Sequence, residues 1–256
     1  MAVRTAMVDR AFGQAGSTLV IEECLTGPEV SFFALCDGRR AVVLGTAQDH
    51  KRIFDGDRGP NTGGMGAFAP SPLMTPELES TVMRTIVQPV MEGFQADGGY
   101  RGFLYVSLML TPDGPKVIEF NVRLGDPEAQ VVLPLIEGSF AAILLAAAEG
   151  RLGPQAPQVS DGAAVGVVLA SAGYPGPISS GVTIDGLTDA PAEDVTVFHA
   201  GTARQGDQIV TAGGRVLTVV ARAVTHAEAR TRAYQALSAL HFDGMQYRTD
   251  IGAAFT

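Results

Sequence analysis

The chain has 256 residues, and 46% of them are hydrophobic, which suffices for the core of one large or two ordinary domains. Its formal net charge of −9 and isoelectric point near 4.9 argue against a general affinity for nucleic acid or anionic membranes.

Cysteine content and hydropathy indicate the compartment. Two cysteines, Cys24 and Cys36, cannot form a disulfide framework, so we expect buried thiols in a reducing compartment such as the cytoplasm. The longest apolar run, 140–148, falls short of the roughly 18 residues of a membrane helix. We therefore expect a soluble protein with no membrane partner. The first residues should form an amphipathic helix rather than a signal peptide.

The first elements are short and rich in Val, Leu, Ile and Phe. Residues 18–24, 29–36 and 40–46 read as three strands separated by turn residues, which predicts an antiparallel meander. The periodic pattern then disappears, and 47–72 is expected to be one long loop. Loops of this length in compact domains are usually functional or disordered.

A helix and a hairpin come next. Thr75 is an N-cap before Pro76, so a helix should begin there and reach about Gln95. Residues 100–110 and 116–121 read as two strands joined by a Pro-Asp-Gly-Pro turn. Two helices should follow near 127–136 and 140–149, both apolar enough to be largely buried.

A linker is predicted at 153–160, because its Pro and Gln residues neither pack nor continue a helix. Beyond it, Thr225 and Glu228 form a capping box for a helix reaching about Leu240. A small sheet is expected from 165–170, 195–200, 208–211 and 215–221. The predicted domains are 1–152 and 160–256, in a mixed α+β and α/β fold.

The hairpin carries the first candidate site. Alternation along the returning strand places Glu119 and Asn121 on the same face. Carboxylate and amide oxygens suit a hard cation such as Mg²⁺, which keeps several waters and is usually completed by substrate phosphates. We therefore expect a metal site there.

The loop from Gly59 to Gly66 holds four glycines and could turn its backbone NH groups toward an anion. It lacks the Lys-Ser/Thr pair of a phosphate-binding Walker loop, and a purely structural turn is an equal alternative. Residues 49–52, Asp-His-Lys-Arg, precede it. A solvated charge run is the ordinary reading, but their position favours contacts with phosphate or carboxylate groups.

Several motifs together resemble a known family. VIEECLTGPEVSF from Val20, QDHKR from Gln48, GPNTGGMGAF from Gly59 and RLGDPEAQ from Arg123 are similar to phosphoribosylamine–glycine ligases, also called glycinamide ribonucleotide synthetases. YRTDIG from Tyr247, together with GYPG, VFHAGT and GGRVL, resembles the C-terminal domain of that family. The resemblance spans nearly the whole chain.

This resemblance implies the C-terminal part of an ATP-grasp fold and the joining of glycine to 5-phosphoribosylamine, with ATP consumed, in purine biosynthesis. It implies ATP with Mg²⁺ or Mn²⁺ as cofactors, metal ligation by Glu119 and Asn121, and catalytic roles for Arg123, Asp126 and Glu128. The implied nucleotide-binding residues are Glu22, Glu23, Leu25 and Glu29. The implied substrate-binding residues are Asp49, Lys51, Arg52, Asn61, Thr62, Gly63 and Gly64.

In the family, VIEE lies well inside the chain, after an N-terminal domain and a part that supplies phosphate-binding lysines. The expectation is therefore a fragment that needs an N-terminal half, which another chain could provide. Two alternatives stay open. One is a noncatalytic nucleotide-binding or interaction remnant, and the other is an ATP-grasp ligase acting on a different acid.

Overall fold

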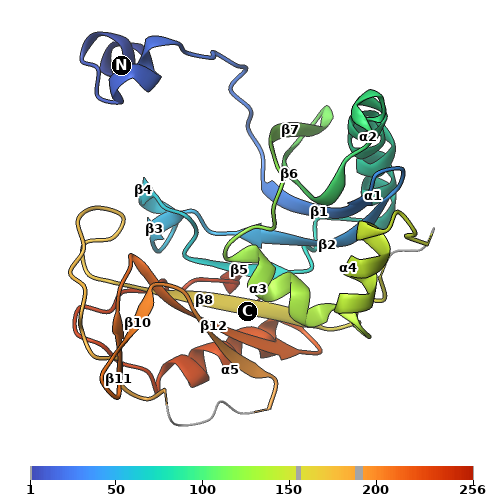
Figure 1. Ribbon diagram of the computed structural model, residues 1–256. Coiled ribbons are helices and arrows are strands. Elements are labelled where there is room, and N and C mark those ends of the chain that lie inside the picture. Colours follow the sequence, from blue (N-terminus) through green and yellow to red (C-terminus); the bar gives the residue numbers. More distant parts are fainter. Residues whose placement is uncertain (1, 154–156, 188–192, 256) are drawn as a thin grey trace.

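The computed structural model describes residues 2–153, 157–187 and 193–255 (Figure 1). The strands are β1 Glu29–Asp37, β2 Ala41–Asp49, β3 Arg52–Phe54, β4 Arg58–Asn61, β5 Gly66–Ala69, β6 Arg101–Thr111, β7 Gly114–Asn121, β8 Ala163–Ala170, β9 Val195–His199, β10 Thr202–Gln205, β11 Gln208–Thr211 and β12 Arg215–Ala223. The α-helices are α1 Pro76–Val82, α2 Gln88–Gly93, α3 Glu128–Val132, α4 Phe140–Ala148 and α5 His226–Leu237. Short π or 3₁₀ turns cover Arg4–Val8, Gly13–Ser17, Met83–Val87, Gln95–Asp97, Leu133–Leu135 and Ala253–Phe255.

One antiparallel sheet organises the molecule. Within the described residues its eight strands follow the order β7-β6-β1-β2-β5-β8-β12-β9. The strand β5, which precedes the predicted linker, pairs with β8, which follows it, from Gly66 opposite Val167 to Ala69 opposite Ala164. The sheet therefore runs across the predicted domain boundary without a break.

Helices pack on the sheet and build its cores. Figure 1 shows α1 and α2 beside β1, α3 in front of β5 and β8, and α5 below β12. Val131 and Val132 of α3 share a buried cluster with Phe33 of β1, Ala164 of β8 and Val220 of β12. This cluster joins the two predicted domains through side chains as well as through the sheet.

Helix starts were predicted well. The Thr75 side chain accepts a hydrogen bond from the NH of Leu78, and the Thr225 side chain accepts one from the NH of Glu228. The helix predicted to reach Gln95 continues from α1 through a π turn into α2, which ends at Gly93. The predicted hairpin appears as β6 and β7.

The first predicted strand, 18–24, is wrong. This segment is extended but forms no strand, and Val20 and Ile21 are each 82% exposed. Its apolar residues mimic a strand pattern, yet it has no neighbour to supply a hydrogen-bonding ladder. In Figure 1 it leads from β1 to N-terminal turns that stand away from the rest of the chain. Cys24 on this segment is exposed, contrary to expectation, whereas Cys36 is buried.

Three further expectations need correction. The supposed loop 47–72 contains β3, β4 and β5. The helix α4 is not largely buried, since Leu145 is 57% exposed and only Ala147 is buried within it. The strands of the second unit do not make a small sheet of their own, because β8, β12 and β9 extend the large one and β11 pairs with β10. Part of the predicted linker, 154–156, lies outside the described residues.

None of the helices in the described part of the chain is long and apolar enough to cross a membrane.

Candidate functional site

The predicted metal pair lies on β7, the edge strand next to β6. An irregularity in the β6–β7 ladder places Glu119 opposite Ser107 but Val117 opposite Leu108. The side chains of Glu119 and Asn121 meet, with Asn121 Nδ2 donating to Glu119 Oε1 at 2.9 Å. The predicted common face is therefore confirmed.

The donor chemistry of this pair fits a hard cation. The contact with Glu119 uses the amide NH₂ of Asn121, which leaves its carbonyl oxygen as an acceptor. Among residues 2–153, 157–187 and 193–255, no group of three or more His, Cys, Asp or Glu side chains could hold a metal alone. An ion held here would need most of its ligands from phosphate and water, as Mg²⁺ at phosphate-transfer sites does.

A hollow of about 430 Å³ adjoins the start of β7. It is lined by Glu22, Glu23, Leu25, Glu29, Met109, Lys116, Val117 and Ile118. All four residues predicted to bind the nucleotide are thus brought together. Lys116 Nζ donates to both carboxylate oxygens of Glu23, at 3.0 and 2.7 Å, and this hydrogen bonding raises the pKa of Lys116.

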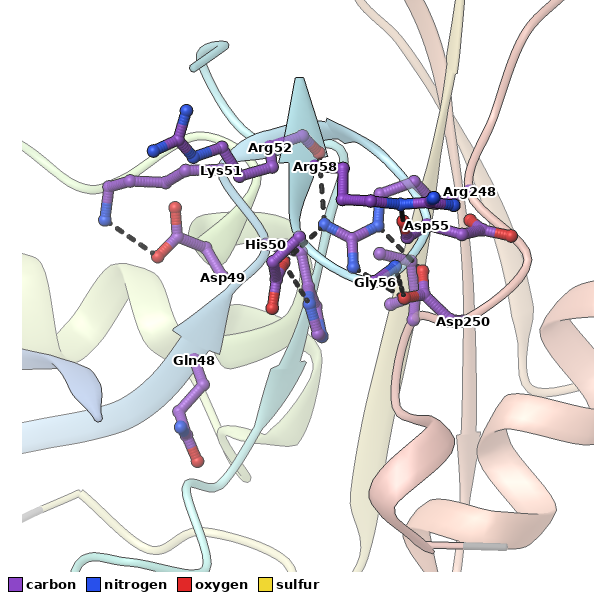
Figure 2. Close-up of polar contacts among 12 residues, drawn as sticks. Gln48, Asp49, His50, Lys51, Arg52, Asp55, Gly56, Arg58, Arg248 and Asp250 are labelled. Atoms are coloured by element: carbon purple, nitrogen blue, oxygen red, sulfur yellow. Dashed lines mark hydrogen bonds and ion pairs between the residues drawn. The ribbon is translucent and has the colours of Figure 1, made fainter. Parts of the chain in front are cut away.

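A second pocket, of about 720 Å³, lies between the β2–β4 region and the C-terminal segment. Of the predicted substrate-binding residues, it is lined by Asp49, Lys51, Arg52 and Asn61. Glu29 lines both this pocket and the hollow beside β7, so the two cavities adjoin. Lys51 Nζ donates to Glu29 at 2.7 Å and to Asp49 at 3.1 Å, and Figure 2 shows its contact with Asp49.

One wall of this second pocket comes from residues to which the sequence assigned no role. Arg248 is 1% exposed and donates from Nε and Nη2 to the two oxygens of Asp250, each at 2.7 Å. Its Nη1 donates to Asp57 Oδ1 at 2.7 Å. The same Nη1 donates to the carbonyl of Arg52 at 3.1 Å (Figure 2). The motif YRTDIG contained the signal, an arginine two residues before an aspartate, but not the partner Asp57.

His50 lies in the same pocket. Its Nδ1 is 3.7 Å from Asp57 Oδ1, and its buried Nε2 has no hydrogen-bond partner within the described part of the chain. Burial and the nearby charge of Arg248 lower the pKa of His50, although Asp57 acts against them. The lowered pKa favours the neutral imidazole, and the unpartnered Nε2 is enclosed by the protein.

Glu128 is buried inside the protein. It is 4% exposed, and its Oε1 accepts hydrogen bonds from Ser31 Oγ at 3.1 Å and from the Tyr105 hydroxyl at 3.2 Å. Burial, and then the charge of Asp49, raise the pKa of Glu128. The carboxylate thus lies within the wall between β1, β6 and α3 rather than on an open surface.

The other two predicted catalytic residues are exposed. Arg123 Nη1 donates to the carbonyl of Leu124 at 2.9 Å. Asp126 accepts from Gln130 through Oδ1 at 2.9 Å and from Arg215 Nη2 through Oδ2 at 3.1 Å. Arg215 also donates to the carbonyl of Gly63, so it connects Asp126 with the glycine loop.

The backbone of the glycine loop does not serve as an anion cradle at its centre. The NH groups of Thr62, Gly63, Gly64 and Met65 are donated within the protein, to Lys51 O, Tyr174 Oη, Thr62 Oγ1 and His50 O. Of the two alternatives left open by the sequence, these contacts favour the structural turn over an anion-binding loop. Thr62, Gly63 and Gly64 also lie outside the lining of the second pocket.

Comparison with known proteins identifies the family. The profile described as phosphoribosylglycinamide synthetase, ATP-grasp (A) domain, matches residues 1–129, and the profile of the C domain matches 164–254. The chain belongs to the phosphoribosylglycinamide synthetase family.

Curated relatives of this chain are called phosphoribosylamine–glycine ligases. That of Brucella melitensis is 48% identical over 244 residues, 94% of this chain and 57% of the relative. That of Chlorobaculum tepidum is 49% identical over 255 residues, 98% of this chain and 60% of the relative. The chain thus spans about three fifths of the length of these relatives.

Solved structures agree on the fold. The phosphoribosylamine–glycine ligase of Thermotoga maritima superposes with a TM-score of 0.80 and 39% identity, over 90% of this chain and 57% of that one. The biotin carboxylase domain of the Hydrogenobacter thermophilus 2-oxoglutarate carboxylase gives a TM-score of 0.71 at 19% identity, over 96% and 52%. The predicted ATP-grasp architecture is confirmed.

Proposed function

We propose that this chain carries the metal-binding and substrate-binding part of a site that ligates glycine to 5-phosphoribosylamine. The reaction would pass through a glycyl phosphate and give glycinamide ribonucleotide, ADP and phosphate in purine biosynthesis. The observation that supports it most is the contact between Glu119 and Asn121 beside the hollow lined by Glu22, Glu23, Leu25 and Glu29. The fold and the names of the relatives agree with this assignment.

ATP would occupy the hollow beside β7, with its phosphates directed toward Glu119 and Asn121. A bound Mg²⁺ or Mn²⁺ would neutralise charge on the transferred phosphoryl group. The acids Glu22, Glu23 and Glu29 suit ribose hydroxyls as acceptors, while Leu25, Met109 and Val117 offer apolar surface to a base. Lys116 neutralises one of these acids through its contact with Glu23.

The substrates would occupy the adjoining pocket. Lys51, Arg52 and Asn61 line it and suit a phosphate or carboxylate. Arg123 is exposed and can approach the acyl phosphate, where a positive charge stabilises the transition state. Glu128 would act from within the wall by accepting hydrogen bonds from Ser31 and Tyr105. Asp126 would act from the edge of the glycine loop, where it binds Arg215.

A second candidate is a nucleotide-binding unit without turnover of its own. The observation in its favour is that both lysines of the chain are held in ion pairs, Lys51 with Glu29 and Asp49 and Lys116 with Glu23. The longer relatives offer further chain that could contribute phosphate contacts. In this case a missing N-terminal half, on the same or another polypeptide, would complete the site in the cytoplasm.

Titration calorimetry and a turnover assay test these candidates on the chain as it exists. With Mg²⁺ present, we expect ATP to bind to the wild type and bind at least about tenfold more weakly to Glu119→Gln, because one anionic ligand is lost. Exposed Glu137 is the control, and Glu137→Gln should bind as the wild type does. ADP release that depends on glycine and 5-phosphoribosylamine supports the ligase.

Magnesium-dependent ATP binding without turnover favours the second candidate. Equal ATP affinity in the wild type and Glu119→Gln would contradict the metal assignment. Turnover with another carboxylic acid in place of glycine would indicate a different ATP-grasp ligase.

A further inference from the structure

Arg215 stands at the start of β12 and reaches two other parts of the chain. Its Nη1 donates to the carbonyl of Gly63 at 2.7 Å and to the carbonyl of Asp126 at 2.6 Å. Its Nη2 donates to Asp126 Oδ2 at 3.1 Å. The side chain is 20% exposed, so water competes little for these donors. One guanidinium therefore ties the glycine loop to the turn that carries a predicted catalytic residue.

Tyr174 holds the same loop from another side. Its hydroxyl accepts the NH of Gly63 at 2.9 Å, so both backbone polar groups of Gly63 are bound by side chains of the second unit. Tyr174 is itself fixed, because Gln246 Nε2 donates to its carbonyl at 3.0 Å. Its ring packs so closely on the chain that a Cβ added at Gly214 would lie 2.3 Å from the ring. The loop is therefore held by a tyrosine that is itself hydrogen-bonded and closely packed.

The space around the loop explains its glycines. A Cβ at Gly63 would lie 3.0 Å from the guanidinium carbon of Arg215. Gly64 has φ +113°, and a Cβ there would lie 2.5 Å from Pro127 Cδ. Side chains at these positions would push the loop away from Arg215 and from the Asp126–Pro127 turn. The glycines thus allow close approach to protein groups rather than to a phosphate.

We propose that Arg215 and Tyr174 are positioning residues of the candidate site, which clamp the glycine loop to Asp126. The predicted change in KM rests on the proposed ligase function, whereas the clamp itself does not. Asn61 lines the second pocket and lies just before the clamped glycines, whereas Glu119 and Asn121 lie on β7 and hydrogen-bond to each other. The clamp therefore sets how the acceptor and acid substrates sit, and leaves the nucleotide side unchanged.

The variants are chosen to remove single contacts. Arg215→Gln removes the charge and the paired donors, Arg215→Lys keeps the charge with a less suitable geometry, and Tyr174→Phe removes only the acceptor of the Gly63 NH. Arg222 is the matched control, since it lies on the same strand and donates to Asp194 Oδ1 at 2.7 Å and to the carbonyl of Pro134 at 3.1 Å. Within the described residues, its side-chain hydrogen bonds go to these two partners and not to the loop or Asp126.

Amide hydrogen exchange on the full chain measures the clamp directly. For the segment 59–66 we expect exchange to be roughly tenfold faster or more in Arg215→Gln and Tyr174→Phe, intermediate in Arg215→Lys and unchanged in Arg222→Gln. Melting temperatures of all variants show whether the fold is kept. Unchanged exchange in both Arg215→Gln and Tyr174→Phe overturns the proposal.

Steady-state kinetics separates positioning from general stability. Arg215→Gln should raise the KM for glycine or 5-phosphoribosylamine by about tenfold and leave the KM for ATP unchanged, with partial recovery in Arg215→Lys. Equal increases in all three KM values overturn the positioning role. If the wild type shows no turnover, the proposed function fails, and the exchange pattern alone decides whether the clamp exists.

Discussion

Arg248 and Asp250 form a two-point ion pair in which Nε and Nη2 of the arginine each lie 2.7 Å from one oxygen of the carboxylate. The arginine is 1% exposed and also holds Asp57 and the carbonyl of Arg52. The C-terminal segment is thereby attached to the β2–β4 region that forms the other side of the 720 Å³ pocket.

Replacement of Arg248 by Met should lower the free energy of unfolding by about 3 kcal/mol, because two carboxylates lose their buried partner. Urea denaturation measures this loss. Arg84 is exposed, and Arg84→Met should leave the urea midpoint unchanged. A loss below about 1 kcal/mol in Arg248→Met would mean that the pair contributes little to stability.

Acid should weaken the same contact. Burial acts to raise the pKa of Asp250, but hydrogen bonds from Arg248 and from the NH of Gly56 outweigh it and hold that pKa well below its usual range. Since the folded pKa lies below the unfolded value of about 3.9, Asp250 stabilises the protein above about pH 4, and this contribution disappears as pH falls further. Asp250→Asn should flatten the acid limb of a stability profile.

The control for that profile is Asp243, whose side chain is 95% exposed. Asp243→Asn should keep the wild-type acid limb. Wild-type and Asp250→Asn curves that stay parallel from pH 7 to pH 2 would contradict the role of Asp250.

Glu128 should show the opposite dependence on pH. Because burial raises its folded pKa above the unfolded value near 4.3, its stabilising contribution is complete below about pH 4 and is lost as pH rises through the folded pKa. Glu128→Gln keeps an acceptor for Ser31 and Tyr105 without the charge, so its stability relative to the wild type should increase from pH 4 to pH 8.

Glu128→Ala serves as the comparison. It leaves the hydroxyls of Ser31 and Tyr105 without their acceptor, so it should be about 2 kcal/mol less stable than Glu128→Gln at every pH. Denaturant titrations across that pH range measure both variants. Equal pH slopes in the wild type and Glu128→Gln would show that the carboxylate does not titrate in a buried environment.

Lys116 should matter for ligand binding and not for stability. Its contact with Glu23 is exposed, and exposed ion pairs contribute little. Lys116→Met should therefore leave the urea midpoint unchanged and weaken ATP binding several-fold, because Glu23 would lose its neutralising cation and repel the phosphates. Calorimetry measures the affinity, and tighter ATP binding by Lys116→Met would argue against a nucleotide in this hollow.

The parts of the site that follow strand and turn rules could be predicted from the sequence. Strand alternation alone predicted that Glu119 and Asn121 share a face. The N-cap residues Thr75 and Thr225 predicted where α1 and α5 begin. The family resemblance predicted that Glu22, Glu23, Leu25 and Glu29 bind the nucleotide. The structure shows that these four residues line one hollow.

What the sequence could not predict depends on contacts between distant segments. Nothing local shows that Arg215 reaches Gly63, or that Arg248 reaches Asp57. The glycines of 59–66 suggested an anion cradle, because sequence cannot tell whether a close neighbour is a ligand or another part of the protein. Residues 18–24 have a strand's composition, but strand formation requires a partner edge that no local pattern reveals.

The pairing of β5 with β8 has a consequence for how the polypeptide behaves when its backbone is severed. Gly66 to Ala69 of one matched region lie opposite Val167 to Ala164 of the other, and Val131 and Val220 share the core behind them. A protease that cuts within 153–160 should therefore yield a nicked complex that migrates as one species under native conditions. The two pieces should separate only in denaturant and should melt together in a single cooperative transition.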